Sequence, residues 1–188
     1  MTKHTTPEMT ADVDNPWGET REVFALFGAT LLLVQTAERV MRTCLKYALP
    51  KGGVLTADLL ERQTTEEAKK TLGWFIGQLR RRIVVLPEFD AELADFLDQR
   101  NQFVHHLDTL KGIDFETQNG RAVAGLFAQR LATKAVHVTK VFTGFLRSWA
   151  EQIGMEDGID ESEYLAEIDS IYKPRLAEFF ADRDPGSS

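Results

Sequence analysis

The chain has 188 residues, of which 43% are apolar and 27% charged, the size and composition of one globular domain rather than of a fibrous or disordered protein. One cysteine, Cys44, excludes an internal disulfide framework and any cysteine-rich metal site. The net charge of −7 argues against non-specific coating of nucleic acid, and residues 151–188 carry the acidity, with 11 acidic and 3 basic residues.

The N-terminal region combines a polar start with a long apolar helix. Residues 1–16 are polar, so we expect a flexible tail without a secretory signal. The uncharged stretch Val23–Ala37 is too short for a relaxed membrane span, and we expect a cytoplasmic protein without membrane contact. From Trp17 to about Leu49, apolar spacing of three and four predicts one helix. Its inward seam comprises Phe24, Phe27, Leu31, Val34, Glu38, Met41 and Leu45.

Two or three helices follow in the middle of the chain. A short one is predicted through Asp58–Leu60, and Thr64 with Glu67 fits a capping box for a helix from about Thr65 to Val84. Pro87 begins the next helix, because proline is favoured in the first turn. The inward residues are Leu72, Phe75, Ile76 and Leu79 on the first of these two longer helices, and Leu93, Phe96, Leu97, Phe103, Val104 and Leu107 on the second.

The last third of the chain predicts one long helix and one short one. After a loop at residues 111–120, a helix covers about Arg121 to Gln152 and ends at Gly154. A short acidic helix at residues 161–171 is expected to stop before Pro174.

These elements predict an all-α protein, an antiparallel bundle of four to five helices. The triplet Ile83–Val85 is the only β-like stretch, and no segment alternates for long enough to predict a strand. We expect a flexible tail at 1–16, a helical bundle at 17–153, and an acidic C-terminal helical segment and tail at 154–188.

Two charged residues interrupt the apolar seams. Glu38 falls on the seven-residue repeat of the first long helix, and Arg100 lies between apolar positions of the helix that Pro87 begins. A buried charge without a partner is costly, so each needs the other or a polar environment. The alternatives are a structural Glu38–Arg100 ion pair and an Arg100 that lines a polar cleft or a dimer interface.

A short polar motif follows Arg100 on the same helix. Asn101 and His105 are four residues apart and share one side of the helix. An arginine can hold a phosphate through its fork of N–H groups, and a histidine can move a proton near neutral pH. The two side chains are sufficient in principle to cleave RNA without a metal ion.

The motif Arg100-Asn101-x3-His105 resembles that of the HEPN domains (higher eukaryote and prokaryote nucleotide-binding). The resemblance covers roughly residues 18–150, although only the stretch from Arg100 to His106 is specific. It implies an all-α fold, a homodimer built around the helix that carries Arg100, and a composite RNA site where two motifs meet. By this resemblance, Arg100 and His105 are catalytic, and Asn101 and His106 are supporting residues. Glu38 is a further supporting residue because of its expected contact with Arg100.

A basic cluster is the second candidate for contact with RNA. It consists of Lys69, Lys70, Arg80, Arg81 and Arg82, which could also be a solvated helix end. No sequence motif for a metal site or for a phosphate-binding loop is present, and we expect no metal and no cofactor.

Two functions remain open from the sequence. The first is a HEPN-like, metal-independent endoribonuclease of toxin or defence type. The second is a non-catalytic HEPN-like dimeric binding or regulatory protein, whose acidic C-terminal segment engages a protein partner.

Overall fold

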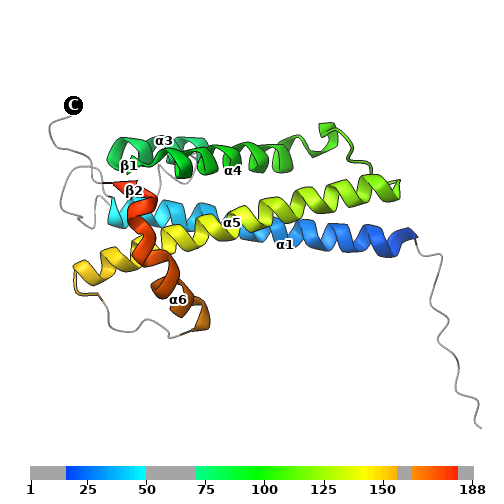
Figure 1. Ribbon diagram of the computed structural model, residues 1–188. Coiled ribbons are helices and arrows are strands. Elements are labelled where there is room, and N and C mark those ends of the chain that lie inside the picture. Colours follow the sequence, from blue (N-terminus) through cyan, green and yellow to red (C-terminus); the bar gives the residue numbers. More distant parts are fainter. Residues whose placement is uncertain (1–15, 50–70, 156–161, 182–188) are drawn as a thin grey trace, which may run out of the picture.

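The protein is a bundle of long helices, shown along its length in Figure 1. This computed structural model describes residues 16–49, 71–155 and 162–181. The α-helices are α1 (Pro16–Thr43), α3 (Leu72–Arg82), α4 (Pro87–His105), α5 (Gln118–Gln152) and α6 (Glu163–Glu167). Shorter helical turns are η1 (Cys44–Ala48), η2 (Leu107–Thr109), η3 (Ile168–Tyr172) and η4 (Lys173–Glu178). The all-α class is confirmed.

The buried side of α1 lies slightly off the predicted seam. The members of the seam that are buried as predicted are Phe27, Val34, Glu38, Met41 and Leu45. Phe24 and Leu31, in contrast, are 54% and 38% exposed. A seven-residue repeat drifts by about 20° per repeat on a straight helix, so these early positions rotate out of the core. Thr30, Ala37 and Cys44 are buried in the same helical stretch, and burial raises the pKa of the Cys44 thiol.

The contact between α1 and α5 is parallel. Thr30 Oγ1 donates to the carbonyl of Ala128 at 3.3 Å, and the Cys44 thiol donates to the carbonyl of Phe142 at 3.2 Å. Both pairs are 98 positions apart, so the two helices run in the same direction, as Figure 1 also shows. The predicted antiparallel arrangement was wrong for this pair. It holds for α4, which runs antiparallel to both α3 and α5.

Helix α3 begins later than predicted. Thr71 has an extended backbone, with φ −76° and ψ 158°, and its hydroxyl accepts a hydrogen bond from the N–H three residues later at 3.4 Å. A continuous helix from Thr65 was therefore wrong. The pair Thr64 and Glu67 and the short helix through residues 58–60 lie outside the described residues. The predicted inward side is confirmed, since the buried residues of α3 include Leu72, Phe75, Ile76 and Leu79.

Local sequence explains where α4 and α5 begin and end. Pro87 lies in the first turn of α4, as predicted. Helix α5 begins at Gln118, inside the predicted loop, because Thr117 caps it by accepting a hydrogen bond from the Gly120 N–H at 3.1 Å. Gly154 follows the end of α5 with φ +72°, a conformation that glycine adopts without strain.

The inward side of α4 was predicted correctly except near its end. Leu93, Phe96 and Phe103 are buried, and Leu97 is half-buried. Val104 is 41% exposed, because it follows Phe103 by one residue and points about 100° away from it.

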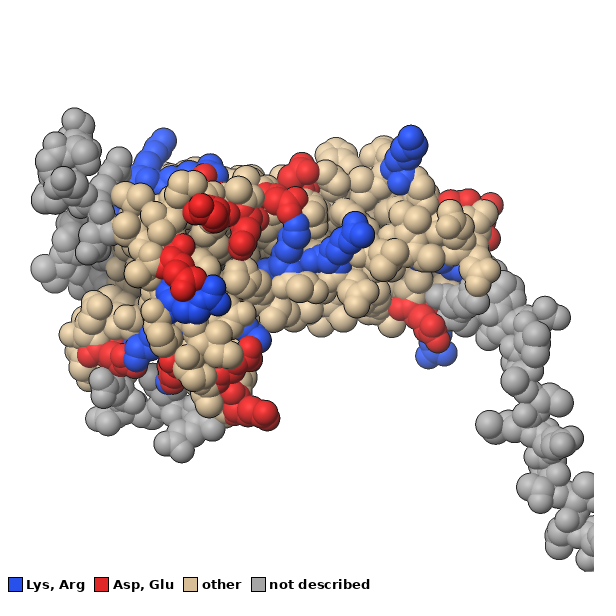
Figure 2. All heavy atoms as spheres, in the orientation of Figure 1, with Lys and Arg blue, Asp and Glu red and all other residues tan. Residues whose placement is uncertain are grey.

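The C-terminal segment packs against α5 (Figure 1). Figure 2 shows acidic and basic side chains interspersed over this part of the surface. The ion pairs between α5 and the segment are Lys140–Glu167, Arg147–Asp169 and Glu151–Lys173. Two of the acidic side chains of this segment, Glu167 and Asp169, are therefore paired within the chain.

The same segment ends in a strand that the sequence did not predict. The helical stretch of α6 and η3 ends at Tyr172, before Pro174 as predicted. Pro174 then lies in the first turn of the separate 3₁₀ turn η4, where its missing N–H is not needed. Strand β2 (Phe180–Ala181) then pairs antiparallel with β1 (Val84–Val85). Each strand has only two residues, which is too short to give an alternating pattern.

One helical stretch bears on membrane contact. By length and composition, residues 20–48 are apolar enough to cross a membrane, and 28% of their most apolar window is buried inside the bundle. The core helix of a soluble protein passes the same test. The absence of membrane contact stays a prediction.

Candidate functional site

The two charges that interrupt the apolar seams meet between α1 and α4. Arg100 Nε donates to Glu38 Oε1 at 2.8 Å, and the two side chains are only 20% and 11% exposed. Of the alternatives that the sequence leaves open for these two charges, the Glu38–Arg100 ion pair is present. Because either charge alone would be costly at this depth, the contact fixes the orientation of the Arg100 guanidinium.

The other edge of this guanidinium faces the rest of the motif. Arg100 Nη1 donates to Asn101 Oδ1 at 3.1 Å and lies 3.5 Å from His105 Nε2. A guanidinium can only donate hydrogen bonds, so Nε2 can act only as the acceptor in this contact. His105 is exposed, and Asn101 is half-buried. A fixed cation and a solvent-facing histidine therefore lie side by side near the end of α4.

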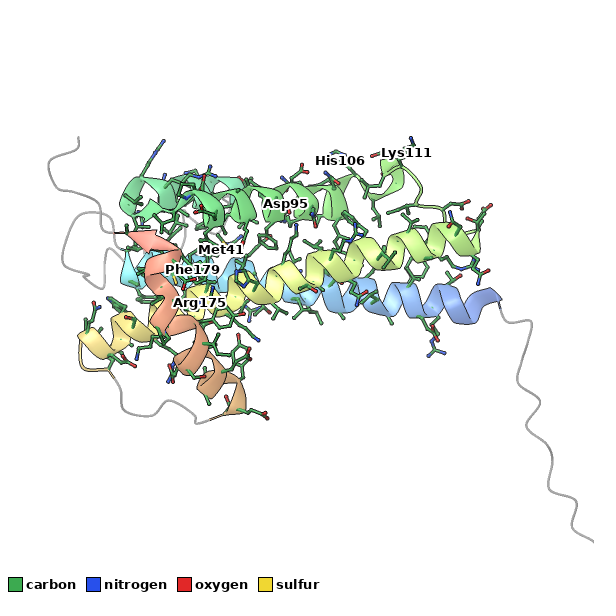
Figure 3. All side chains as sticks on the ribbon, viewed as in Figure 1. Met41, Asp95, His106, Lys111, Arg175 and Phe179 are labelled. Carbon is green, nitrogen blue, oxygen red and sulfur yellow. The ribbon has the colours of Figure 1, made fainter. Side chains whose placement is uncertain are left out.

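His106 is separate from this cluster. It is the cap residue of α4, with φ −137° and ψ 21°, and its carbonyl accepts a hydrogen bond from Thr109 Oγ1 at 2.8 Å. Its ring centroid is 6.2 Å from that of His105, and Figure 3 places it at the outer edge of the molecule. Within the described residues, no three His, Cys, Asp or Glu side chains are grouped closely enough to ligate a metal ion.

Arg42 belongs to the cluster, although the sequence analysis did not identify it. Its Nη2 lies 3.6 Å from Glu38 Oε2, and its guanidinium carbon is 4.8 Å from the centroid of the Phe75 ring. The sequence feature that could have identified Arg42 is its spacing of four residues from Glu38 on the same helix, which places the two side chains next to each other. One carboxylate thus lies between two guanidinium groups, and Glu38, Arg42 and Arg100 together carry one positive charge.

Two arginines of the basic cluster make contacts inside the chain. Arg80 Nε donates to Asp90 Oδ1 at 2.6 Å. Arg82 Nη1 donates to the carbonyls of Leu45 and Leu49 at 2.7 and 2.6 Å, which satisfies acceptors at the end of the first helical stretch.

The basic cluster is also distant from the motif. Arg80 pairs near the start of α4, ten residues or about 15 Å along the helix from Arg100. Arg81 is exposed. Lys69 and Lys70 lie outside the described residues. The structure therefore does not bring Arg80 or Arg82 together with Arg100 and His105.

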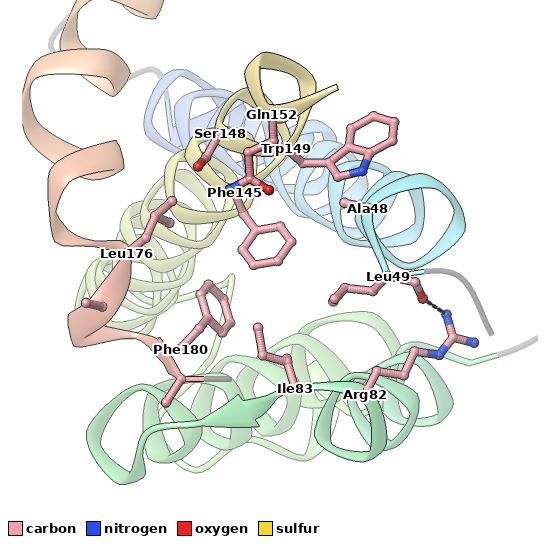
Figure 4. A pocket seen from close by; sticks show the side chains of 12 residues that line it. Ala48, Leu49, Arg82, Ile83, Phe145, Ser148, Trp149, Gln152, Leu176 and Phe180 are labelled. Carbon is pink, nitrogen blue, oxygen red and sulfur yellow. Dashed lines mark hydrogen bonds between the residues drawn. The ribbon is translucent and has the colours of Figure 1, made fainter. Parts of the chain in front are cut away.

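A cavity of about 600 Å³ lies at the end of the bundle where α5 ends (Figure 4). Its apolar lining includes Leu49, Ile83, Phe145, Trp149, Leu176 and Phe180. Arg82 is the charged group in its described lining, and this side chain already donates to two backbone carbonyls. We assign no chemistry to this cavity.

A second polar group joins α4 to α5. His137 Nε2 lies 3.1 Å from Glu92 Oε2, and Lys134 pairs with Asp95, which Figure 3 labels. The His137 ring packs against Phe89, Tyr172 and Phe179. These contacts hold helices together, and the packed environment of His137 agrees with a structural role.

The candidate site is therefore Arg100, Asn101 and His105 on α4, with Glu38 and Arg42 on α1. Comparisons of the chain with protein-family models, with curated proteins and with solved structures find no match.

Proposed function

We propose that the protein is a HEPN-like, metal-independent endoribonuclease of toxin or defence type that acts as a homodimer. The observation that carries the proposal is the 3.5 Å contact between Arg100 Nη1 and His105 Nε2 within an Arg-Asn-x3-His motif. Glu38 and Asn101 are supporting residues, because each makes a hydrogen bond to the Arg100 guanidinium.

The proposed reaction uses the nucleophile that RNA itself carries. His105 takes the proton of a ribose 2′-hydroxyl, whose oxygen attacks the adjacent phosphorus. The P–O5′ bond breaks as the P–O2′ bond forms, and a second His105, from the other copy, protonates the leaving 5′-oxygen. Arg100 stabilises the negative charge that grows on the phosphate oxygens. The products are a 2′,3′-cyclic phosphate and a 5′-hydroxyl.

Exposed apolar side chains near the motif support the homodimer. Between Glu22 and Glu38, α1 carries no charged residue, yet Leu31, which lies two turns before Glu38 on nearly the same side of the helix, is 38% exposed. On α4, Val104 is 41% exposed beside His105. Where exposed apolar side chains form a continuous patch, the patch commonly marks an interface. A second copy placed there would bring its own motif close to the first.

The test is cleavage of a pool of single-stranded and structured RNAs. We expect Arg100→Ala and His105→Ala each to abolish cleavage while the protein stays folded. His106→Ala is the matched control, because it removes a neighbouring exposed histidine that lies outside the cluster, and it should retain most of the activity. Cleavage that survives Arg100→Ala and His105→Ala would overturn the proposal.

One observation favours the second function. Arg100 already donates to Glu38 and Asn101, which is what a structural ion-pair network requires. In a non-catalytic HEPN-like dimeric binding or regulatory protein, these residues would only hold α4 to α1. A folded wild-type dimer that cleaves no RNA of the pool would favour this alternative.

A further inference from the structure

Arg42 has donor groups that the fold does not use. Beyond its contact with Glu38 it makes no hydrogen bond within the described part of the chain, and its Nε is buried without a partner. Its side chain is 38% exposed, so solvent and ligands can reach the guanidinium.

The position of this guanidinium is nevertheless well defined. It meets the Glu38 carboxylate and also lies over the ring of Phe75, which is 0% exposed. Stacking on an aromatic ring and pairing with a carboxylate both restrict an arginine side chain before a ligand binds. Arg42 is therefore partly preorganised, which reduces the entropy lost on binding.

The charge around Glu38 favours an anion. Glu38 holds Arg100 at 2.8 Å and Arg42 at 3.6 Å, so the shorter contact belongs to Arg100 and Arg42 is held more loosely. One negative charge cannot neutralise two guanidinium groups. Phosphate suits guanidinium groups, as carboxylate also does, because its oxygens accept two parallel N–H donors.

We propose that Arg42 binds a backbone phosphate of RNA next to the phosphate that Arg100 contacts. This inference rests on the proposed function, because it takes single-stranded RNA as the ligand. It makes the cluster a two-arginine clamp, in which Glu38 spaces the guanidinium groups and His105 lies beyond Arg100. Arg42 then contributes to RNA affinity rather than to proton transfer.

The test measures binding without cleavage. The probe is a short single-stranded RNA with 2′-O-methyl groups throughout, which cannot undergo attack by its own 2′-oxygen. We expect Arg42→Gln to weaken binding about tenfold, the size of one lost charge-assisted contact. The slope of log affinity against log salt should fall by about 0.7, as for one released counterion on a single strand. Arg42→Lys should keep the salt slope and lose part of the affinity, because lysine keeps the charge without the fork.

The matched control is Arg21→Gln. Arg21 is exposed on the same helix, about 30 Å from Arg42 along the helix axis, and its loss removes the same charge. It should change affinity less than twofold. Thermal unfolding of each variant checks the fold, and Arg42→Gln should remain folded because the Glu38–Arg100 pair is retained.

The outcomes separate this inference from the proposed function. Equal affinity of Arg42→Gln and Arg21→Gln, or no binding of the probe by the wild type, would overturn the role of Arg42. Binding that depends on Arg42, without cleavage of unmodified RNA by the wild type, would uphold this inference and overturn the nuclease. Arg42-dependent binding of polyglutamate with none of the RNA probe would show that the site takes acidic protein, and would also overturn the inference.

Discussion

Glu38 is the residue that determines the geometry of the cluster, because its two carboxylate oxygens face two different guanidinium groups. Its removal leaves Arg42 and Arg100 facing each other without a counter-charge. The loss of Arg100, in contrast, leaves Glu38 with Arg42 as its partner. Removal of the Glu38 charge therefore leaves more uncompensated charge in the folded protein than removal of the Arg100 charge does.

We predict that Glu38→Gln destabilises the protein more than Arg100→Gln does. The expected loss for Glu38→Gln is about 2 kcal/mol, between the values for exposed and for buried pairs. Urea unfolding at neutral pH measures the loss in the free energy of unfolding for both variants. Arg39→Gln, an exposed change on the same helix, should stay within about 0.5 kcal/mol of the wild type. An equal or larger loss for Arg100→Gln would show that Glu38 does not organise the cluster.

The sequence predicted the contact of Glu38 with Arg100, which is distant in the chain, and missed its contact with Arg42, which is one helical turn away. Glu38 and Arg100 each interrupt an apolar seam, and burial requires a partner, so their meeting follows from the pattern. Arg42 lies one turn from Glu38 in a spacing that is common on ordinary exposed helices. Its position over Phe75 depends on how α3 packs against α1, which no local pattern encodes.

Among the elements, α5 has a first turn with no room for a side chain at Gly120. A Cβ added at Gly120 would lie 2.1 Å from the carbonyl oxygen of Asp114, closer than real atoms approach. Gly120 therefore lets the preceding loop pack directly on the first turn of α5.

We predict opposite effects for two glycine substitutions in α5. Gly120→Ala should destabilise the protein by about 1–3 kcal/mol, because backbone atoms must move. Gly125→Ala should stabilise it by about 0.5–1 kcal/mol, since nothing lies within 4 Å of the added Cβ and alanine favours a helix. Thermal unfolding of the two variants measures these changes in stability. A Gly120→Ala variant as stable as the wild type would contradict the close approach of Asp114 to Gly120.

The C-terminal segment should be held to α5 in a pH-dependent way. The Arg147 guanidinium donates two hydrogen bonds to Asp169 and lowers the pKa of that carboxyl below its ordinary value. A lowered folded-state pKa contributes stability above the unfolded pKa of about 4, and this contribution is lost as the pH falls through the folded value.

Asp169→Asn should therefore lower the melting temperature at pH 7, and its difference from the wild type should shrink as the pH falls below about 4. Melting curves across this range measure the effect. Glu178→Gln removes the partner of Arg175 in an exposed pair and should change little at any pH. A difference for Asp169→Asn that stays constant from neutral to acid pH would refute the role of the ion pair.

For the whole molecule, periodicity predicted the helices but not their directions. The spacing of apolar residues located the long helices and most of their buried positions, because burial on one side of a helix leaves a local signal. The parallel contact of α1 and α5 depends on connections and packing that leave no such signal. The same holds for β1 and β2, whose partners are far apart in the chain.

We predict that the protein is a dimer at about 10 μM, a concentration suited to an interface of moderate affinity. Val104→Lys should shift it toward monomer, because it places a charge on exposed apolar surface of the helix that carries Arg100. Ile171→Lys is the matched control, since Ile171 is similarly exposed, at 46%, in η3. Sedimentation equilibrium distinguishes dimer from monomer for the wild type and for each variant. A monomeric wild type, or equal dissociation of the dimer by the two substitutions, would argue against this interface.

The chemical identity of the cleaved ends tests the central claim most directly. RNA is cut by the wild type in the presence of EDTA, and the products are compared with those of an RNA that carries one 2′-deoxynucleotide at a mapped cleavage position. The proposed mechanism predicts 2′,3′-cyclic phosphate and 5′-hydroxyl ends, full activity in EDTA, and no cleavage at the 2′-deoxy position. Cleavage at that position, or ends with a 3′-hydroxyl and a 5′-phosphate, would mean that water attacks the phosphate and would contradict an Arg100–His105 nuclease.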